Sequence, residues 1–300
     1  MYSAVVFAIN EPGRHVTDCL LQKGISVPLL FTRPRTSGDA VLPDGLARKK
    51  NIPFEYISAF SQEIVERIRW CQPDFIISGW FHLKIPQTVI NLSRCFSVNL
   101  HPSLLPAYRG PSPVEWCIMN GEAETGLTLH KLEASFDTGE ILWQKAVQIL
   151  GNETGGEILK KILDLVPSAI DNLLLRTESA DFAGNRQDSL QVSYYPKWVS
   201  EDTYINWEWD ASKIHNRIRA LNPRATAHAK GDSSDYCIPG SSLTDEYSHQ
   251  KAPGTILEIS DNGRSVKVVC GDKRVVHLSG LTPPLGLLGR TRLFHGLNAQ

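Results

Sequence analysis

The chain has 300 residues, of which 42% are hydrophobic, and this apolar content is enough to bury one large core or two ordinary ones. Its formal net charge of −1 excludes an overall basic field that would bind nucleic acid or a membrane surface, although a local patch can still exist. Six widely spaced cysteines without a C-x-x-C pair predict neither a disulfide framework nor a metal site, and the lack of a signal-like or membrane-spanning apolar run favours a cytoplasmic protein.

The first hundred residues alternate short apolar runs with amphipathic segments. Residues 13–24 and 61–72 carry apolar side chains at helical spacing. Apolar runs rich in Val, Ile and Phe, typical of buried strands, lie at 3–9, 26–32, 54–57, 74–80 and 96–101. Because strands that alternate with helices build βαβ units, we expect a Rossmann-like α/β fold with an open, mostly parallel sheet.

The second half of the chain changes character near residue 180. Before it, we expect a short helix from 115, paired strands at 126–132 and 140–149, and one long helix at about 154–176. The polar, Gly- and Pro-punctuated stretch 181–203 is interpreted as a linker between a domain of residues 1–180 and a smaller domain of residues 204–300. A helix and several short alternating runs predict a small OB-like β-barrel there; the helix is at 211–221 and the runs are at 225–230, 254–260, 265–271 and 274–280.

Two polar side chains stand at the end of the predicted strand 96–101. Asn99 and His101 are two residues apart, so they lie on one face of that strand. In an open parallel sheet, ligands bind outside the carboxyl ends of the strands, which is where this pair is expected. The loop that follows is stiffened by prolines at 102, 106, 111 and 113 and contains Gly110.

The chain lacks the sequence motifs of the common phosphate and redox sites. Neither G-x-G-x-x-G nor G-x-x-x-x-G-K-[ST] occurs, and H-E-x-x-H and G-x-S-x-G are also missing. This leaves Asn99, His101, His130 and Asp137, each of which has an ordinary structural explanation when taken alone. Together they offer an amide donor for an oxyanion, an imidazole for proton transfer and a carboxylate. That set suits acyl transfer to an amine through a tetrahedral intermediate, without a nucleophilic side chain.

Two stretches resemble a known family. "NLHPSLLPAYRG" (99–110) and "ETGLTLHKLEASFDTGEIL" (124–142) resemble the signature of the folate-dependent formyltransferases, which include methionyl-tRNA formyltransferase and the sugar-amine N-formyltransferases. "INWEWDASKIHNRIRALNP" (205–223) is similar to the start of their C-terminal domain. The resemblance implies transfer of a formyl group from 10-formyltetrahydrofolate to a primary amine, with no metal.

The resemblance also implies roles for individual residues. Asn99 would stabilise the oxyanion, His101 would shuttle a proton, and Asp137 would orient the imidazole and help to deprotonate the amine. The folate pocket would be lined by "SGWFHLKIP" (78–86), although these aromatic side chains could equally belong to the core. By the same resemblance, the folate contacts would be Trp80, Phe81, Leu83, Ile85 and Asp137, and Ser103, Leu104 and His130 are candidate acceptor contacts. Arg109, beside the catalytic loop, could meet a phosphate or carboxylate of the acceptor, and a solvated arginine is an equally ordinary explanation.

The nature of the acceptor stays open between alternatives. We favour a small-molecule amine, such as an aminosugar nucleotide or an amino-acid-type amine. A tRNA acceptor is the alternative, but the stretch 32–51 is short and lacks a Gly-Arg-Gly run. Residues 201–300 also carry only 12 Lys and Arg against 11 Asp and Glu, which is no phosphate-binding surface. A formylfolate hydrolase or a non-catalytic formylfolate-binding protein is the third hypothesis, and no oligomeric state is predicted.

Overall fold

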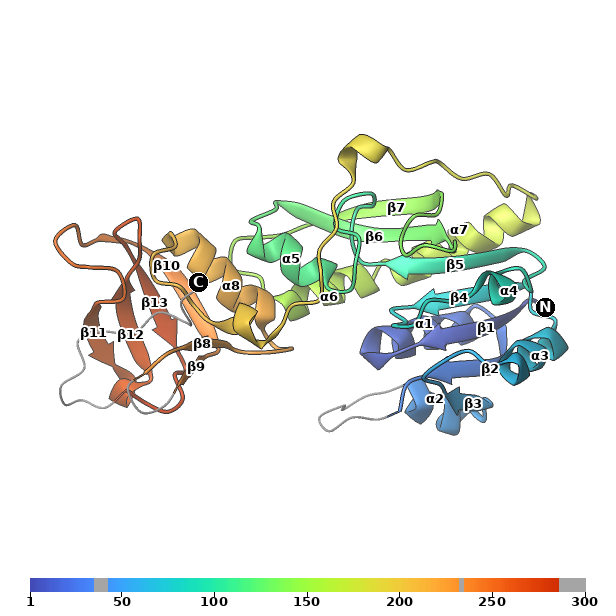
Figure 1. Ribbon diagram of the computed structural model, residues 1–300, viewed down its shortest axis with the longest axis horizontal. Coiled ribbons are helices and arrows are strands. Elements are labelled where there is room, and N and C mark those ends of the chain that lie inside the picture. The colour runs from blue at the N-terminus through green and yellow to red at the C-terminus, as the bar shows by residue number, and fades with distance from the viewer. Residues whose placement is uncertain (35–42, 232–234, 286–300) are drawn as a thin grey trace. The chain divides into compact units, whose positions relative to one another are not determined.

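A computed structural model describes residues 1–34, 43–231 and 235–285 (Figure 1). By their contacts, these residues form two compact units. Unit 1 contains residues 1–111, 126–147 and 161–195, and unit 2 contains residues 112–125, 148–160 and the described residues from 196 onward. Each unit is described by itself below.

Unit 1 is built on a seven-stranded sheet with the strand order β3-β2-β1-β4-β5-β6-β7. The first five strands in this order pair with one another in parallel, whereas β6 runs antiparallel to β5. This confirms the predicted open, mostly parallel sheet, whose strand order reverses between β1 and β4. The strands are β1 (Ser3–Ala8), β2 (Ser26–Thr32), β3 (Phe54–Tyr56), β4 (Phe75–Gly79), β5 (Phe96–His101), β6 (Glu124–Lys131) and β7 (Ile141–Gln148).

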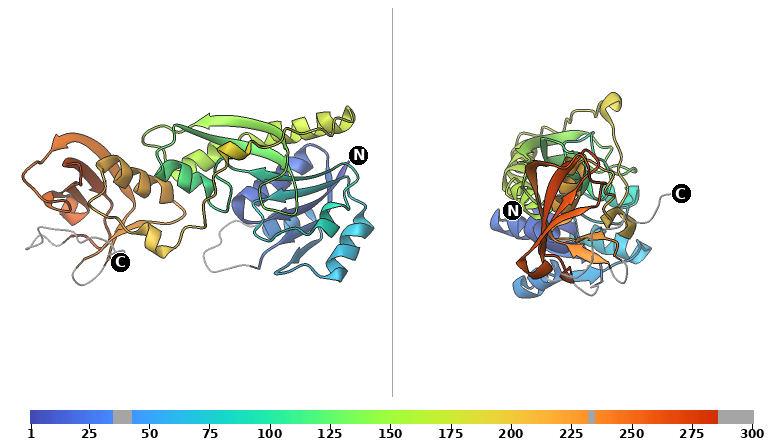
Figure 2. Two further views of the ribbon diagram at one scale, coloured as in Figure 1. Left: turned by 45° about the horizontal axis from the view of Figure 1, so that its top comes forward. Right: turned by 90° about the vertical axis from the view of Figure 1, so that its left-hand side faces the viewer.

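Helices cover both faces of this sheet, as Figure 2 shows in a second orientation. Helices α1 (Asn10–Gln22) and α2 (Pro43–Lys50) pack against each other, and α7 (Val166–Glu178) contacts α1. The opposite face carries α3 (Gln62–Cys71) and α4 (Gln87–Ile90), whose apolar side chains join those of β1, β2 and β4 in one buried cluster. Because both faces are covered, the central strands are apolar on both sides, as their sequences predict.

The predicted long helix at 154–176 is wrong as a single element. The chain forms α6 (Gly155–Leu163) and then α7, with Asp164 and Leu165 between them. Pro167 lies in the first turn of α7. Proline has no N–H to donate to the carbonyl four residues earlier, so it is tolerated in a first turn but ends a helix that precedes it.

Unit 2 contains the short helix α5 (Pro113–Met119), the helix α8 (Ala211–Leu221) and antiparallel strands. The strands form a four-stranded sheet of order β10-β13-β12-β11 and a separate pair, β8 with β9. These small sheets fit the predicted OB-like domain, although strand pairing among the described residues does not close a barrel. The strands are β8 (Ala227–Ala229), β9 (Tyr236–Ile238), β10 (Gly240–Tyr247), β11 (Ile256–Ser260), β12 (Ser265–Val269) and β13 (Arg274–Ser279).

The predictions for α8 and for β11 to β13 are confirmed to within two residues at most ends. The eight-residue strand β10 was not predicted, because its sequence GSSLTDEY is polar and nearly all of it is exposed or half-buried. Part of the stretch 32–51, which bears on the tRNA alternative, lies outside the described residues at 35–42.

Candidate active site

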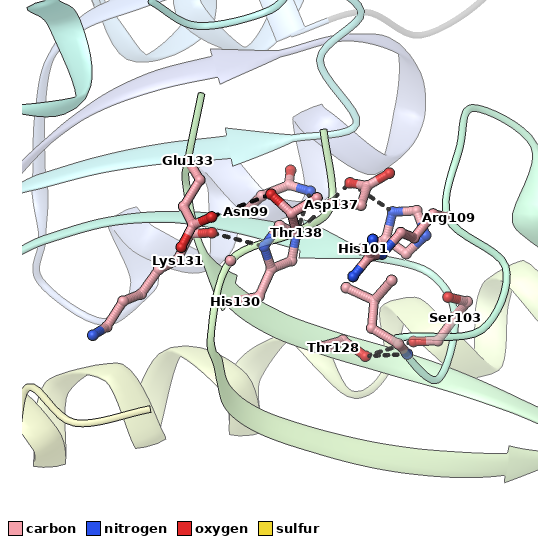
Figure 3. A network of polar contacts seen from close by, with 12 residues as sticks. Asn99, His101, Ser103, Arg109, Thr128, His130, Lys131, Glu133, Asp137 and Thr138 are labelled. Carbon is pink, nitrogen blue, oxygen red and sulfur yellow. Dashed lines mark hydrogen bonds and ion pairs between the residues drawn. The ribbon is translucent and has the colours of Figure 1, made fainter. Parts of the chain in front are cut away.

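The pairing of β5 with β6 brings Asn99 opposite His130 and His101 opposite Thr128. Asn99 and His101 are two positions apart on β5, so both side chains lie on the same face of the sheet. Asp137 comes from the loop between β6 and β7 and points toward both imidazoles (Figure 3). The structure therefore brings together the four residues that the sequence singled out.

The hydrogen bonds of His130 fix its tautomer. Its Nδ1 lies 2.8 Å from the carbonyl oxygen of Lys131, which can only accept, so Nδ1 carries the proton. Its Nε2 is then an acceptor, and the Asn99 atom 3.0 Å away is the amide nitrogen Nδ2, which donates. Asn99 makes no other side-chain hydrogen bond to the described part of the chain, so the second N–H of its amide is held in place and free to bind a ligand oxygen.

Burial keeps His130 neutral. Its side chain is only 2% exposed, and desolvation lowers its pKa to about 4 even though Asp137 acts in the opposite direction. A neutral His130 is what the bond from Asn99 requires, because a protonated Nε2 could not accept it. The imidazole thus serves as a fixed acceptor that orients the amide at neutral pH.

We expect His130 to make the folded protein more stable at neutral than at acidic pH. Its pKa is lowered in the folded state, so the unfolded chain binds the extra proton between about pH 6.5 and 4, and stability is lost as the pH falls through that window. His130→Gln removes this titration, so the loss of unfolding free energy from pH 7 to pH 4 should shrink by about 2–3 kcal/mol. Urea unfolding of both proteins at the two pH values measures this difference, and an equal loss in both would contradict it.

His101 and Asp137 form a pair within ion-pair distance. Nε2 of His101 lies 2.9 Å from the carbonyl oxygen of Tyr108 and donates to it. Nδ1 lies 3.3 Å from Oδ1 of Asp137. A proton on Nδ1 would be stabilised by this carboxylate, whereas a bare Nδ1 lone pair would face its negative charge. The arrangement therefore suits a pair that takes up one proton and passes it on.

Asp137 is held in a backbone conformation that few residues adopt. Its φ of 57° is left-handed, a region in which Asp is tolerated better than most residues. Its Oδ2 accepts the backbone N–H of Gly110 at 3.0 Å, which joins the β6–β7 loop to the loop after β5. Gly110 itself has a φ of 114°, and a side chain there would collide with the carbonyl oxygen of Tyr195. Glycine is therefore required at the point where Asp137 is anchored.

Ser103 and Thr128 stabilise the loop that begins at Pro102. Ser103 is fully buried, and its hydroxyl donates to the carbonyl oxygen of Ala107. Thr128 donates to the carbonyl oxygen of Ser103 and accepts the N–H of Leu105. The Thr of the Thr-x-His pattern thus supports the loop after β5, and Leu104 lies half-buried in that loop.

Arg109 directly precedes Gly110, whose N–H bonds Asp137, and it is labelled with the site residues in Figure 3. Its guanidinium is half-buried and is held by the side-chain oxygen of Gln187, with Nη2 at 2.6 Å and Nε at 3.2 Å. No acidic side chain among the described residues pairs with it. A fixed and unneutralised guanidinium at this place suits an anionic group on a ligand.

The four residues expected to line a folate pocket differ in their burial. Ile85 belongs to the buried cluster between the sheet and helices α3 and α4, and Phe81 and Leu83 pack against that cluster. The ring of Phe81 also packs against that of Phe7, with 5.3 Å between the ring centroids. Trp80 is half-buried, directly follows β4 and has a left-handed φ of 59°. Phe81, Leu83 and Ile85 therefore contribute to the core, and a folate contact of any of the four stays a prediction.

Two family models match the chain. The formyl transferase model matches residues 24–174, and the model of the formyl transferase C-terminal domain matches residues 197–284. The first match alone spans half of the chain. The chain belongs to the formyl transferase family. This confirms the resemblance that the two signature stretches carry.

Solved structures of formyltransferases and of HypX have similar folds. The N-formyltransferase from Helicobacter canadensis, in complex with folinic acid and dTDP-3-aminofucose, matches with a TM-score of 0.69 and 19% identity over 93% of this chain and 99% of its own. WlaRD, a sugar 3N-formyltransferase solved with dTDP and 5-N-formyl-THF, matches with a TM-score of 0.70 and 19% identity, over 95% of this chain and 99% of its own. HypX from Aquifex aeolicus, solved with tetrahydrofolic acid, matches with a TM-score of 0.67 and 19% identity over 92% of this chain. The match spans only 43% of HypX.

The structure adds residues to this candidate site that the sequence did not indicate. Gln187, Ser193 and Tyr195 come from the stretch expected to be a linker, and all three contact the site loops. No pattern marks them, because the residues around them are polar and mostly exposed.

The described part of the chain contains no group of three or more His, Cys, Asp or Glu side chains that could hold a metal ion. No helix in that part is long and apolar enough to cross a membrane.

Proposed function

We propose that the protein is an N-formyltransferase that moves a formyl group from 10-formyltetrahydrofolate to a primary amine of a small molecule. The observation that carries this proposal is the convergence of Asn99, His101 and Asp137 at one face of the sheet, with Nδ1 of His101 3.3 Å from Oδ1 of Asp137. An amide donor with one free N–H beside a proton-holding pair is the chemistry that acyl transfer to an amine needs.

Each of the three residues has a separate task in the proposed reaction. The free N–H of Asn99 stabilises the negative charge that develops on the formyl oxygen when the amine nitrogen bonds to the formyl carbon. Asp137 accepts the proton that the amine loses, with His101 beside it as the partner that balances its charge. The bond from the formyl carbon to the folate nitrogen then breaks, and that nitrogen receives a proton from the pair. No side chain has to act as a nucleophile.

The donor set around Asp137 fits a formylfolate better than a phosphate or a metal. It consists of one amide, two imidazoles and one carboxylate, and the side chain of Asp137 is only 10% exposed. A single negative charge in such a place disfavours phosphate and suits a neutral formamide group. HypX and WlaRD, which share the fold, were crystallised with tetrahydrofolate and 5-N-formyl-THF. The half-buried Trp80, at the end of β4, remains the best candidate for a folate contact.

The acceptor that we propose is an aminosugar nucleotide or a comparable anionic amine. One protein of similar fold, WlaRD, is a sugar 3N-formyltransferase, and the N-formyltransferase from Helicobacter canadensis was solved with dTDP-3-aminofucose. The guanidinium of Arg109, which is held by a neutral amide and carries its full charge, would meet an anionic group on the acceptor. The nearly balanced charge of residues 201–300 argues against the phosphate backbone of a tRNA.

The release of tetrahydrofolate, measured with and without an amine, tests the proposal. We expect release from 10-formyltetrahydrofolate only when an aminosugar nucleotide or another amine from a panel is present, in equal amount to the formylated amine. Release without any amine would instead identify a hydrolase, and binding without release would identify a formylfolate-binding protein. Because few phosphates are engaged, the rate with the true acceptor should change less than about threefold between 50 and 200 mM salt. A steep fall, together with activity on methionyl-tRNA, would favour the tRNA alternative.

A further inference from the structure

Gln187 connects the two loops that carry the candidate catalytic residues. Its side-chain nitrogen donates to the carbonyl oxygens of Asp137 and of Gly139, both at 2.8 Å. Its side-chain oxygen accepts from Arg109, which lies in the loop after β5. All the hydrogen-bonding capacity of this amide is therefore used, and it is used only on these two loops.

The backbone around Gln187 is itself fixed to unit 1. Two residues earlier, Asn185 exchanges backbone hydrogen bonds with Ile141, at the start of β7. Further along, Arg109 donates its backbone N–H to Ser193 and accepts one from Tyr195. Gln187 is half-buried, whereas the residues on either side of it are exposed. The segment 185–195 thus lies across the site loops and directs one side chain between them.

The bonds from Gln187 act on the part of the loop that determines where the carboxylate lies. Asp137 has a left-handed φ, which is unfavourable for a residue with a side chain unless neighbouring bonds hold it. Gly139 approaches the backbone of Lys131 so closely that a side chain there would collide with it. By donating to the carbonyls of both residues, Gln187 fixes the peptide planes 137–138 and 139–140, one on each side of the peptide that joins Thr138 to Gly139.

We propose that Gln187 is a positioning residue, which holds Asp137 in the conformation that pairs its carboxylate with His101. This rests on the function proposed above, in which that pair carries the proton. Gln187 does not touch the reacting atoms in this account. Its two donated hydrogen bonds set the position of Asp137, and a displacement of about 1 Å in such a group can slow a reaction by a hundredfold.

Two substitutions separate the donated bonds from the accepted one. Gln187→Ala removes all of them. Gln187→Glu keeps an oxygen for Arg109 but replaces the donor with a second oxygen that faces the carbonyls of Asp137 and Gly139. We expect both variants to lower kcat for formyl transfer by about tenfold or more, with KM for formylfolate changed less than threefold. Gln191→Ala is the matched control, because Gln191 lies in the same segment, is exposed, and makes no side-chain hydrogen bond to the described residues. It should keep the wild-type rate.

A second readout does not depend on activity. In protein labelled with ¹⁵N-histidine, the proton between His101 and Asp137 should give a slowly exchanging low-field resonance on Nδ1 of His101. This resonance should be present in the wild type and in Gln191→Ala and be lost in both Gln187 variants. A wild type that shows it but transfers no formyl group would disprove the proposed function and leave the positioning role testable.

Two results would overturn the proposal. If Gln187→Glu keeps the wild-type kcat and resonance, the donated bonds are not needed and Gln187 serves only Arg109. If both variants keep them, the segment 185–195 positions nothing at the site. Comparable melting temperatures of the four proteins show that a lost signal reflects the site rather than the fold.

Discussion

Asp137→Asn is expected to lower the rate of formyl transfer by at least about a hundredfold, the scale of a lost general acid–base group. Asparagine has the same size and can still accept the N–H of Gly110 through its side-chain oxygen. It carries no charge, however, so it can neither take a proton from the amine nor balance a protonated His101 across the 3.3 Å between them. The loss should therefore fall on kcat, while folate affinity stays within about twofold, since the shape of the site is kept.

Single-turnover transfer and an equilibrium titration of folate measure these two quantities separately. Asp164→Asn is a suitable control, because Asp164 is exposed, lies between α6 and α7, and forms no side-chain hydrogen bond or ion pair with the part of the chain that the structure describes. That variant should behave as the wild type. A rate for Asp137→Asn within about threefold of the control would show that this carboxylate takes no part in the chemistry.

His101→Ala should have an effect of similar size, at least about a hundredfold on turnover with folate affinity nearly intact. The substitution removes the ring that holds the proton, and it also leaves the carbonyl of Tyr108 without its donor. His101→Gln is the companion variant, because a glutamine can still donate to that carbonyl but cannot hold and pass on a proton. Both should be slow if proton transfer is the task of His101, whereas recovery in His101→Gln would indicate a structural role.

The double variant of His101→Ala and Asp137→Asn adds a further check on the pair. Residues that act as a unit are not additive, so the double variant should be no more than a few times slower than the slower single variant. His15→Gln, on α1 and without a side-chain partner among the described residues, serves as the control for a histidine substitution. Losses that multiply in the double variant would mean that His101 and Asp137 act independently.

The elements with strong periodicity were predictable from the sequence. The five apolar runs of the first hundred residues form β1 to β5, with the last one confirmed at both ends as Phe96–His101. Alternation along that strand also predicted that Asn99 and His101 share a face. The break before α7 has its signal in Pro167, but the apolar spacing continues on both sides of this proline and favours a single helix.

Contacts that depend on register and on long loops were not predictable. That His130 lies opposite Asn99 follows from the register of β5 against β6, which the local patterns of the two segments do not reveal. The tautomer of His130 depends in turn on the carbonyl of Lys131. No local pattern marks Gln187, since it lies in a polar stretch. Its hydrogen-bond partners are in two loops that are 50 and 78 residues away in the sequence. The domain boundaries at 180 and 204 and the roles of the single site residues stay predictions.

The most direct test of the central claim is the structure of the protein in complex with 5-formyltetrahydrofolate, a stable stand-in for the formyl donor. The account predicts that the formyl oxygen lies within about 3 Å of Nδ2 of Asn99, with the formyl group beside the pair of His101 and Asp137. A folate bound with its formyl group outside hydrogen-bonding distance of all three side chains would contradict it.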